Sequence, residues 1–175
     1  MEIDLAQLRD MHPRLPVDVA LSIVGRAALA LERNGHASGV RLSLYAERIA
    51  TNALLFWPPA DMGNIDRHDR NRITEDGAEA VALAAAHRHR AWRVIRRIQG
   101  EEHADWLLED MGERGRRVVA LEVSGVDRGS IGTRLSDKLA QVTKSVDVDQ
   151  RWAGVVGFEK PAVALHRTKR GKRGE

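Results

Sequence analysis

Two acidic residues of this chain lie inside short apolar segments of the kind that form buried strands. Asp105 belongs to the segment 104–108 and Glu122 to the segment 117–124. Acids are rarely buried without a partner, so an acid within an apolar segment indicates a chemical role. Because side chains alternate between the faces of a strand, Glu122 and Ser124 should project from one face. If the two segments pair, Asp105 can lie beside Glu122.

Paired acids of this kind suit a divalent metal. Two neighbouring carboxylates repel each other, and the pKa of one rises unless a cation neutralises them. Oxygen ligands suit Mg²⁺ or Mn²⁺, which take few protein ligands and keep several waters. A metal held in this way can polarise a phosphoryl oxygen and supply hydroxide at neutral pH. We therefore expect chemistry on a phosphodiester.

Helical patterns precede the two acid-bearing segments. Apolar spacing predicts a helix over Pro16–Asn34. A second helix is expected from Ser38 to Phe56, although the alternation over Val40–Leu44 also fits a strand. A third, longer helix is expected over Thr74–Gln99, with arginines opposite its apolar stripe.

The remaining elements complete an α/β pattern. Strands are expected at 104–108, 117–124, 152–158 and 162–166, with a helix over Ser136–Lys144. This order predicts a three-layer-like sandwich, with a central mixed sheet of about four strands flanked by helices and an N-terminal helical extension. The expected divisions are an extension at 1–60, an α/β core at 61–166 and a basic disordered tail at 167–175.

Over residues 73–158, the acids and their flanking elements resemble the PD-(D/E)XK nuclease superfamily, whose core runs helix, strand, hairpin, strand, helix, strand. The resemblance implies metal-dependent cleavage of DNA or RNA, with Asp105 and Glu122 as metal ligands. It further implies a helix acid before the strands and polar residues on the helix after them. The residues that match these further positions are Glu79 or, less well, Glu75; Lys138 and Gln141; and Glu101 as an additional carboxylate.

One position departs from the superfamily pattern. Where the family has its strand lysine, this chain has Ser124, and a hydroxyl supplies no positive charge. Lys138 can replace that lysine from the following helix, since residues three apart, such as Lys138 and Gln141, share a helix face. The alternative is that Asp105 begins an exposed edge strand and Glu122 simply pairs with an arginine such as Arg134.

Composition bears on partners and compartment. The net charge is +3 over 175 residues, with basic residues concentrated between His87 and Arg97 and in the tail. Arg90, Arg93, Arg97 and Ser124 are predicted to contact nucleic acid, the arginines through its backbone. Without a membrane-length apolar run or a signal-peptide core, we expect a cytoplasmic protein that does not associate with a membrane. A homodimer or a protein partner is also compatible with the sequence.

Other functions remain open at this stage. The first is a binding module that kept a nuclease-like scaffold and lost the chemistry, as the missing strand lysine suggests. The second is an interaction protein with Trp57, Trp92 and Trp106 as interface anchors, although such tryptophans more often belong to a core. The segment 66–69 has metal-ligand residue types but reads better as a solvated loop.

Overall fold

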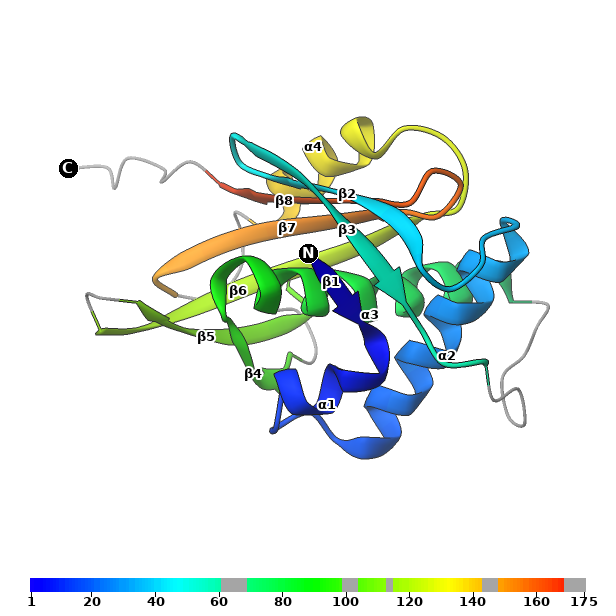
Figure 1. Ribbon diagram of the computed structural model, residues 1–175. Coiled ribbons are helices and arrows are strands. Elements are labelled where there is room, and N and C mark those ends of the chain that lie inside the picture. Colours follow the sequence, from blue (N-terminus) through cyan, green and yellow to red (C-terminus); the bar gives the residue numbers. More distant parts are fainter. Residues whose placement is uncertain (61–68, 99–103, 113–114, 143–147, 169–175) are drawn as a thin grey trace.

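A single sheet organises this protein. The computed structural model describes residues 1–60, 69–98, 104–112, 115–142 and 148–168. Within these ranges eight strands form one mixed sheet in the order β1-β3-β2-β8-β7-β6-β5-β4. The sheet curls, and the helices lie along it (Figure 1). The α/β class is as expected, but the predicted four-stranded sandwich with a helical extension is wrong.

The N-terminal third contributes strands as well as helices. Its elements are β1 (Glu2–Asp4), the 3-10 turn η1 (Leu5–Gln7), α1 (Leu8–Met11), α2 (Val17–Arg33), β2 (Val40–Ala46) and β3 (Ile49–Phe56). The predicted first helix is confirmed as α2. The predicted second helix is wrong, because the segment follows the strand-like alternation that begins at Val40. Leu42, Leu44 and Ala46 are buried, and β2 pairs antiparallel with β3.

The rest of the chain begins with the long helix. Its elements are α3 (Arg70–Arg90), β4 (Arg93–Arg97), β5 (Trp106–Gly112), β6 (Gly115–Val126), α4 (Ile131–Val142), β7 (Gln150–Gly157) and β8 (Ala162–Arg167). All four predicted strands are therefore present, with shifted ends. The last helix starts at Ile131 rather than Ser136, whose hydroxyl instead donates to the Gly132 carbonyl within the helix.

The long helix stops nine residues before its predicted end at Gln99. Ala91 adopts a left-handed conformation (φ 55°) and ends α3, and the chain turns into β4. Trp92 and Val94 are buried while Arg93 is exposed, which is the period of a strand. Residues 78–86 of α3 are buried on every side because the helix lies between the sheet and α2.

The topology around β6 positions the candidate residues. Strands β4, β5 and β6 form an antiparallel meander, and α4 then crosses over to β7, which runs parallel to β6. Gly125 of β6 meets Thr74 of α3, whereas Glu122 contacts α4, so the two helices cover opposite faces of this strand. Strand β8 pairs with β7 and, in parallel, with β2, which joins the N-terminal strands to the same sheet.

Two further expectations concern the basic C-terminal tail and membrane-spanning segments. Arg167 ends β8 and the Thr168 amide donates to the Arg151 carbonyl, while the basic stretch 169–175 lies outside the described residues. No helix within the described ranges is long and apolar enough to cross a membrane.

Candidate functional site

Asp105 immediately precedes β5 and is hydrogen-bonded to β6 through both its backbone and its side chain. Its amide donates to the Leu121 carbonyl (3.0 Å), and its Oδ2 atom accepts from the Val123 amide (2.7 Å). Glu122 lies between these two partners in sequence. Burial raises the pKa of Asp105 to about 6, and the negative charge of Glu122 adds to this effect. The structure therefore brings the two predicted metal ligands together.

The buried carboxylate of Glu122 is neutralised from α4. Lys138 Nζ lies 2.6 Å from Glu122 Oε1, and only 5% of the Glu122 side chain is exposed. Lys138 also donates to Gln141 Oε1 (3.2 Å), one turn further along the helix. Lys138 and Gln141 thus share a helix face toward β6, as their spacing predicts. Glu122 pairs with Lys138, so the alternative prediction that Glu122 pairs with Arg134 is wrong.

Glu79 of α3 forms the third acidic position. Arg97 of β4 donates to Glu79 Oε1 (2.6 Å), while the buried Oε2 makes no hydrogen bond of normal geometry to any described residue. Burial raises the pKa of Glu79 to about 7; Arg97 opposes this rise and Asp105 adds to it. Glu79 therefore feels the charge of Asp105 and can exchange a proton near neutral pH.

Ser124 is enclosed by a second cation from α4. Arg134 Nε donates to Ser124 Oγ (2.8 Å), and the Arg134 guanidinium also reaches Glu75 Oε1 (3.0 Å). Glu75 in turn accepts from the Ser124 hydroxyl and the Gly125 amide. Because Ser124 is fully buried, its predicted contact with nucleic acid finds no support in this geometry.

The sequence reasoning missed Arg134 as part of the site. Arg134 precedes Lys138 by four residues, so the two cations share one face of α4. A positive charge therefore lies beside Ser124 as well as beside Glu122. The four-residue spacing to Lys138 was the signal that could have found Arg134.

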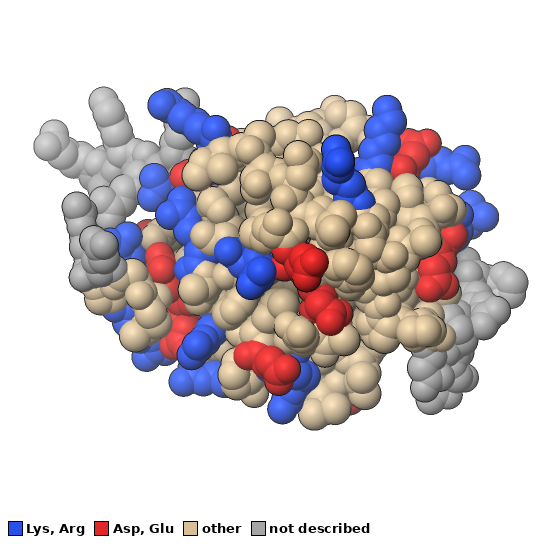
Figure 2. All heavy atoms as spheres, in the orientation of Figure 1, with Lys and Arg blue, Asp and Glu red and all other residues tan. Residues whose placement is uncertain are grey.

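The predicted arginine face does not exist as one helix surface. Arg90 ends α3, pairs with Glu47 (3.4 Å) and lies over the Trp152 ring, whereas Arg93 and Arg97 belong to β4. The end of the molecule that carries β4, β5 and β6 still presents several basic side chains, interspersed with acids (Figure 2). The predicted interface anchors Trp57, Trp92 and Trp106 are all buried.

The arrangement of the acids limits how a metal could bind. Among the described residues no three His, Asp or Glu side chains lie close enough to form a metal cluster. Asp105, whose pKa burial raises to about 6, and Glu122 beside it still fit Mg²⁺, which binds through one or two carboxylates and keeps its waters. Glu101 and the segment 66–68 lie outside the described residues.

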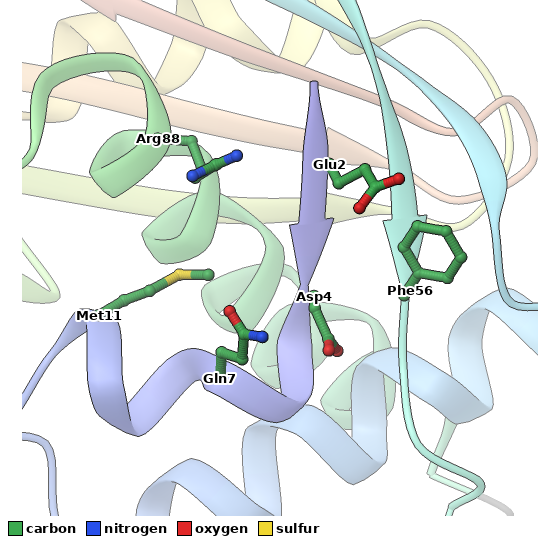
Figure 3. A pocket seen from close by; sticks show the side chains of 6 residues that line it. All are labelled: Glu2, Asp4, Gln7, Met11, Phe56 and Arg88. Carbon is green, nitrogen blue, oxygen red and sulfur yellow. The ribbon is translucent and has the colours of Figure 1, made fainter.

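A cavity of about 320 Å³ lies elsewhere, beside β1. Figure 3 shows its lining side chains, which are Glu2, Asp4, Gln7, Met11, Phe56 and Arg88. None of them belongs to the cluster around Asp105 and Glu122. This cavity therefore contributes nothing to the predicted chemistry.

Comparison with known proteins does not extend this picture. The chain matches no family model, no curated protein and no solved structure.

Proposed function

We propose that this protein is a metal-dependent nuclease that hydrolyses phosphodiester bonds in DNA or RNA. The observation that carries the proposal is the contact between Lys138 Nζ and Glu122 Oε1 at 2.6 Å, next to Asp105. Ser124 lacks the positive charge of the usual strand lysine, and Lys138 supplies it from α4.

The order of elements supports the same proposal. Helix α3, the antiparallel strands β4, β5 and β6, helix α4 and the parallel strand β7 follow one another along the chain. This succession resembles the helix, strand, hairpin, strand, helix and strand of the PD-(D/E)XK core. Glu79 lies on the helix, Asp105 directly before β5 and Glu122 on β6, which is the order of acids that the superfamily resemblance implies.

Each residue would have a distinct role. Asp105 and Glu122 would hold Mg²⁺ or Mn²⁺, and the bound metal would polarise the phosphoryl oxygen and activate water. Lys138 stabilises negative charge that develops on the phosphate, and Gln141 orients its ammonium group. Glu79, whose pKa is about 7, can hold or release a proton near neutrality.

The proposal is tested by nucleotide release from single- and double-stranded DNA and from RNA, with Mg²⁺, Mn²⁺ or chelator. Glu122→Gln and Asp105→Asn should each lower the rate at least about 100-fold, the scale expected for loss of an electrostatic catalytic group. Glu109→Gln is the matched control, because Glu109 lies on β5, is mostly buried and pairs with Arg116. Unchanged cleavage by the Glu122 variant would overturn the assignment.

A binding module without catalysis is the second candidate function. It is favoured by the ion pair of Lys138, which already neutralises Glu122, and by the absence of a three-acid cluster among the residues described. This candidate predicts nucleic-acid binding that responds to salt but not to chelator. Calorimetric titration with Mn²⁺ separates the two: heat from the wild type and none from Asp105→Asn favours the nuclease.

A further inference from the structure

A second cavity lies among α2, α3 and β4. Its volume is about 270 Å³. The lining residues are Asp18, Val19, Ser22, Ile23, Arg26, Arg72, Asp76 and Arg97. Three arginines from three different elements therefore face two aspartates, so the lining carries a net charge of +1.

The three arginines differ in their ion pairs and in their exposure to solvent. Arg26 is mostly buried and forms an ion pair with Asp76. Arg72 is a second cation on the same carboxylate at 3.6 Å, and 67% of its side chain is exposed. Arg97 donates to Glu79 but remains almost half exposed. Asp76 cannot fully neutralise both of its partners, so Arg72 and the outer part of Arg97 are available to a ligand.

The three positive charges also repel one another. Burial lowers the pKa of Arg26, and the charges of Arg72 and Arg97 lower it further. A bound anion would relieve this repulsion. Guanidinium groups favour phosphate in particular, because their planar N–H donors match two phosphate oxygens at once.

Arg97 connects this cavity to the candidate site. Its guanidinium lines the cavity and also donates to Glu79 Oε1 at 2.6 Å. The cavity therefore adjoins Glu79 on the side of β6 that α3 covers, whereas Glu122 lies on the side that α4 covers. Small-molecule sites usually enclose about 300–1,000 Å³, so this smaller cavity suits a phosphate with part of its sugar rather than a whole nucleotide.

We propose that the cavity formed by Arg26, Arg72 and Arg97 binds a backbone phosphate of the nucleic-acid substrate, away from the bond that is cleaved. The inference depends on the proposed function for the identity of the ligand. Contacts of this type position the strand and carry no sequence information. Binding through the cavity should therefore be insensitive to base sequence.

The first experiment measures the binding of fluorescently labelled single-stranded DNA by anisotropy, in chelator, so that catalysis and metal play no part. Arg72→Gln should weaken binding about 5- to 10-fold at low salt and reduce the salt slope by about one. Arg116→Gln is the matched control: Arg116 is similarly exposed, makes one ion pair at 3.3 Å and lies at the far end of β6. Equal losses in the two variants would overturn the proposal, because they would reflect net charge alone.

A second experiment locates the anion directly. Inorganic phosphate titrated into isotope-labelled protein should shift the Nε–Hε resonances of Arg72 and Arg97 and leave that of Arg116 in place. Shifts of all three resonances, or of none, would overturn the proposal that this cavity binds phosphate. Failure of the two proposals is distinguishable: if Glu122→Gln abolishes cleavage while Arg72→Gln behaves like the control, only the cavity is wrong. If Arg72→Gln binds selectively worse while Glu122→Gln still cleaves, only the assigned catalytic site is wrong.

Discussion

The pair of Glu122 and Lys138 belongs to the proposed catalytic site and is also a buried ion pair of the fold. Both side chains are largely withdrawn from water, and each is the hydrogen-bonded partner of the other. Removing one partner of a buried ion pair leaves an uncompensated charge, whereas replacing both removes the cost as well as the gain. Stability and cleavage should therefore respond differently to single and double substitutions here.

Lys138→Met should lower the free energy of unfolding by about 3 kcal/mol near pH 8, because Glu122 is then buried without its cation. The double variant Lys138→Met/Glu122→Gln should recover most of that loss but show no cleavage. Chemical denaturation and nucleotide release measure the two effects. A double variant as unstable as the single one would show that packing, not charge, explains the loss.

The raised pKa of Asp105 predicts a pH dependence of definite sign. The ordinary value is 3.8 and the value in the folded protein is about 6, so the folded state holds this proton more tightly. The stability linked to this proton is fully present below pH 3.8 and is lost as the pH rises through about 6. Relative to Asp105→Asn, the wild type should lose about 3 kcal/mol over this window.

Metal binding should counteract that loss, since a metal binds the ionised carboxylate. Mn²⁺ should raise the unfolding midpoint of the wild type more at pH 7.5 than at pH 5, and should not change that of Asp105→Asn. Denaturation at both pH values, with and without Mn²⁺, measures this. An equal effect of Mn²⁺ on the two proteins would contradict the assigned ligand.

At the scale of elements, the packing of α3 against α2 depends on a helical glycine. A Cβ atom at Gly77 would lie 2.8 Å from the Ala27 amide nitrogen, closer than side-chain carbons come to backbone atoms. The close approach of the two helices explains why residues 78–86 of α3, the helix that carries Glu75 and Glu79, are buried on every side. The placement of both acids therefore depends on this contact.

Gly77→Ala should destabilise the protein by about 1–3 kcal/mol despite the better helix propensity of alanine, because the helices must separate. Gly132→Ala in α4 is the matched control, since its Cβ would meet only Ser130 Oγ at 3.5 Å. That control should stabilise the protein by up to about 1 kcal/mol. Thermal or chemical unfolding of the two variants decides the point, and a neutral Gly77→Ala would contradict the close packing described.

At the scale of the whole molecule, a buried histidine joins distant segments. His12, directly after α1, accepts a hydrogen bond from the Val94 amide of β4 through Nδ1 (3.2 Å). Its Nε2 atom lies 3.1 Å from the Leu83 carbonyl of α3, so the neutral tautomer with hydrogen on Nε2 satisfies both partners. Burial lowers the pKa of His12 to about 4, and the neighbouring His87 and Arg93 lower it further.

This depression predicts acid sensitivity. The unfolded chain takes up a proton near pH 6.5 and the folded protein only near pH 4, so stability is present above pH 6.5 and is lost as the pH falls toward 4. The loss should reach about 3 kcal/mol. His12→Gln should be less stable at pH 7 but lack this component, as denaturation from pH 7 to pH 4 would show. If the free energy of unfolding fell equally steeply with pH in the two proteins, the role of His12 would be contradicted.

Much of the local structure follows from residue pattern. The helix α2, the strands β5 to β8 and the shared face of Lys138 and Gln141 were predicted, because strong 3.6- and two-residue periods report burial on one face. The convergence of Asp105 with Glu122 was predicted from strand pairing alone. Their catalytic role stays a prediction.

Other features depend on contacts between segments far apart in the chain. The segment 38–56 has both helical and alternating character, and its pairing with β8 and β1 decides in favour of strands. The end of α3 was obscured because Trp92 and Val94 continue an apolar pattern that fits either period. The partner of Ser124, Arg134, lies on an element whose start was misplaced.

The order of residues alone thus determined which face of a strand or helix the candidate side chains occupy, because the face depends on local period. Only the tertiary structure decided that eight strands share one sheet, that Lys138 rather than Arg134 neutralises Glu122, and that Arg26, Arg72 and Arg97 meet in one cavity. These outcomes depend on how buried charges and sheet edges find partners across the fold, and a local pattern contains no information about that choice.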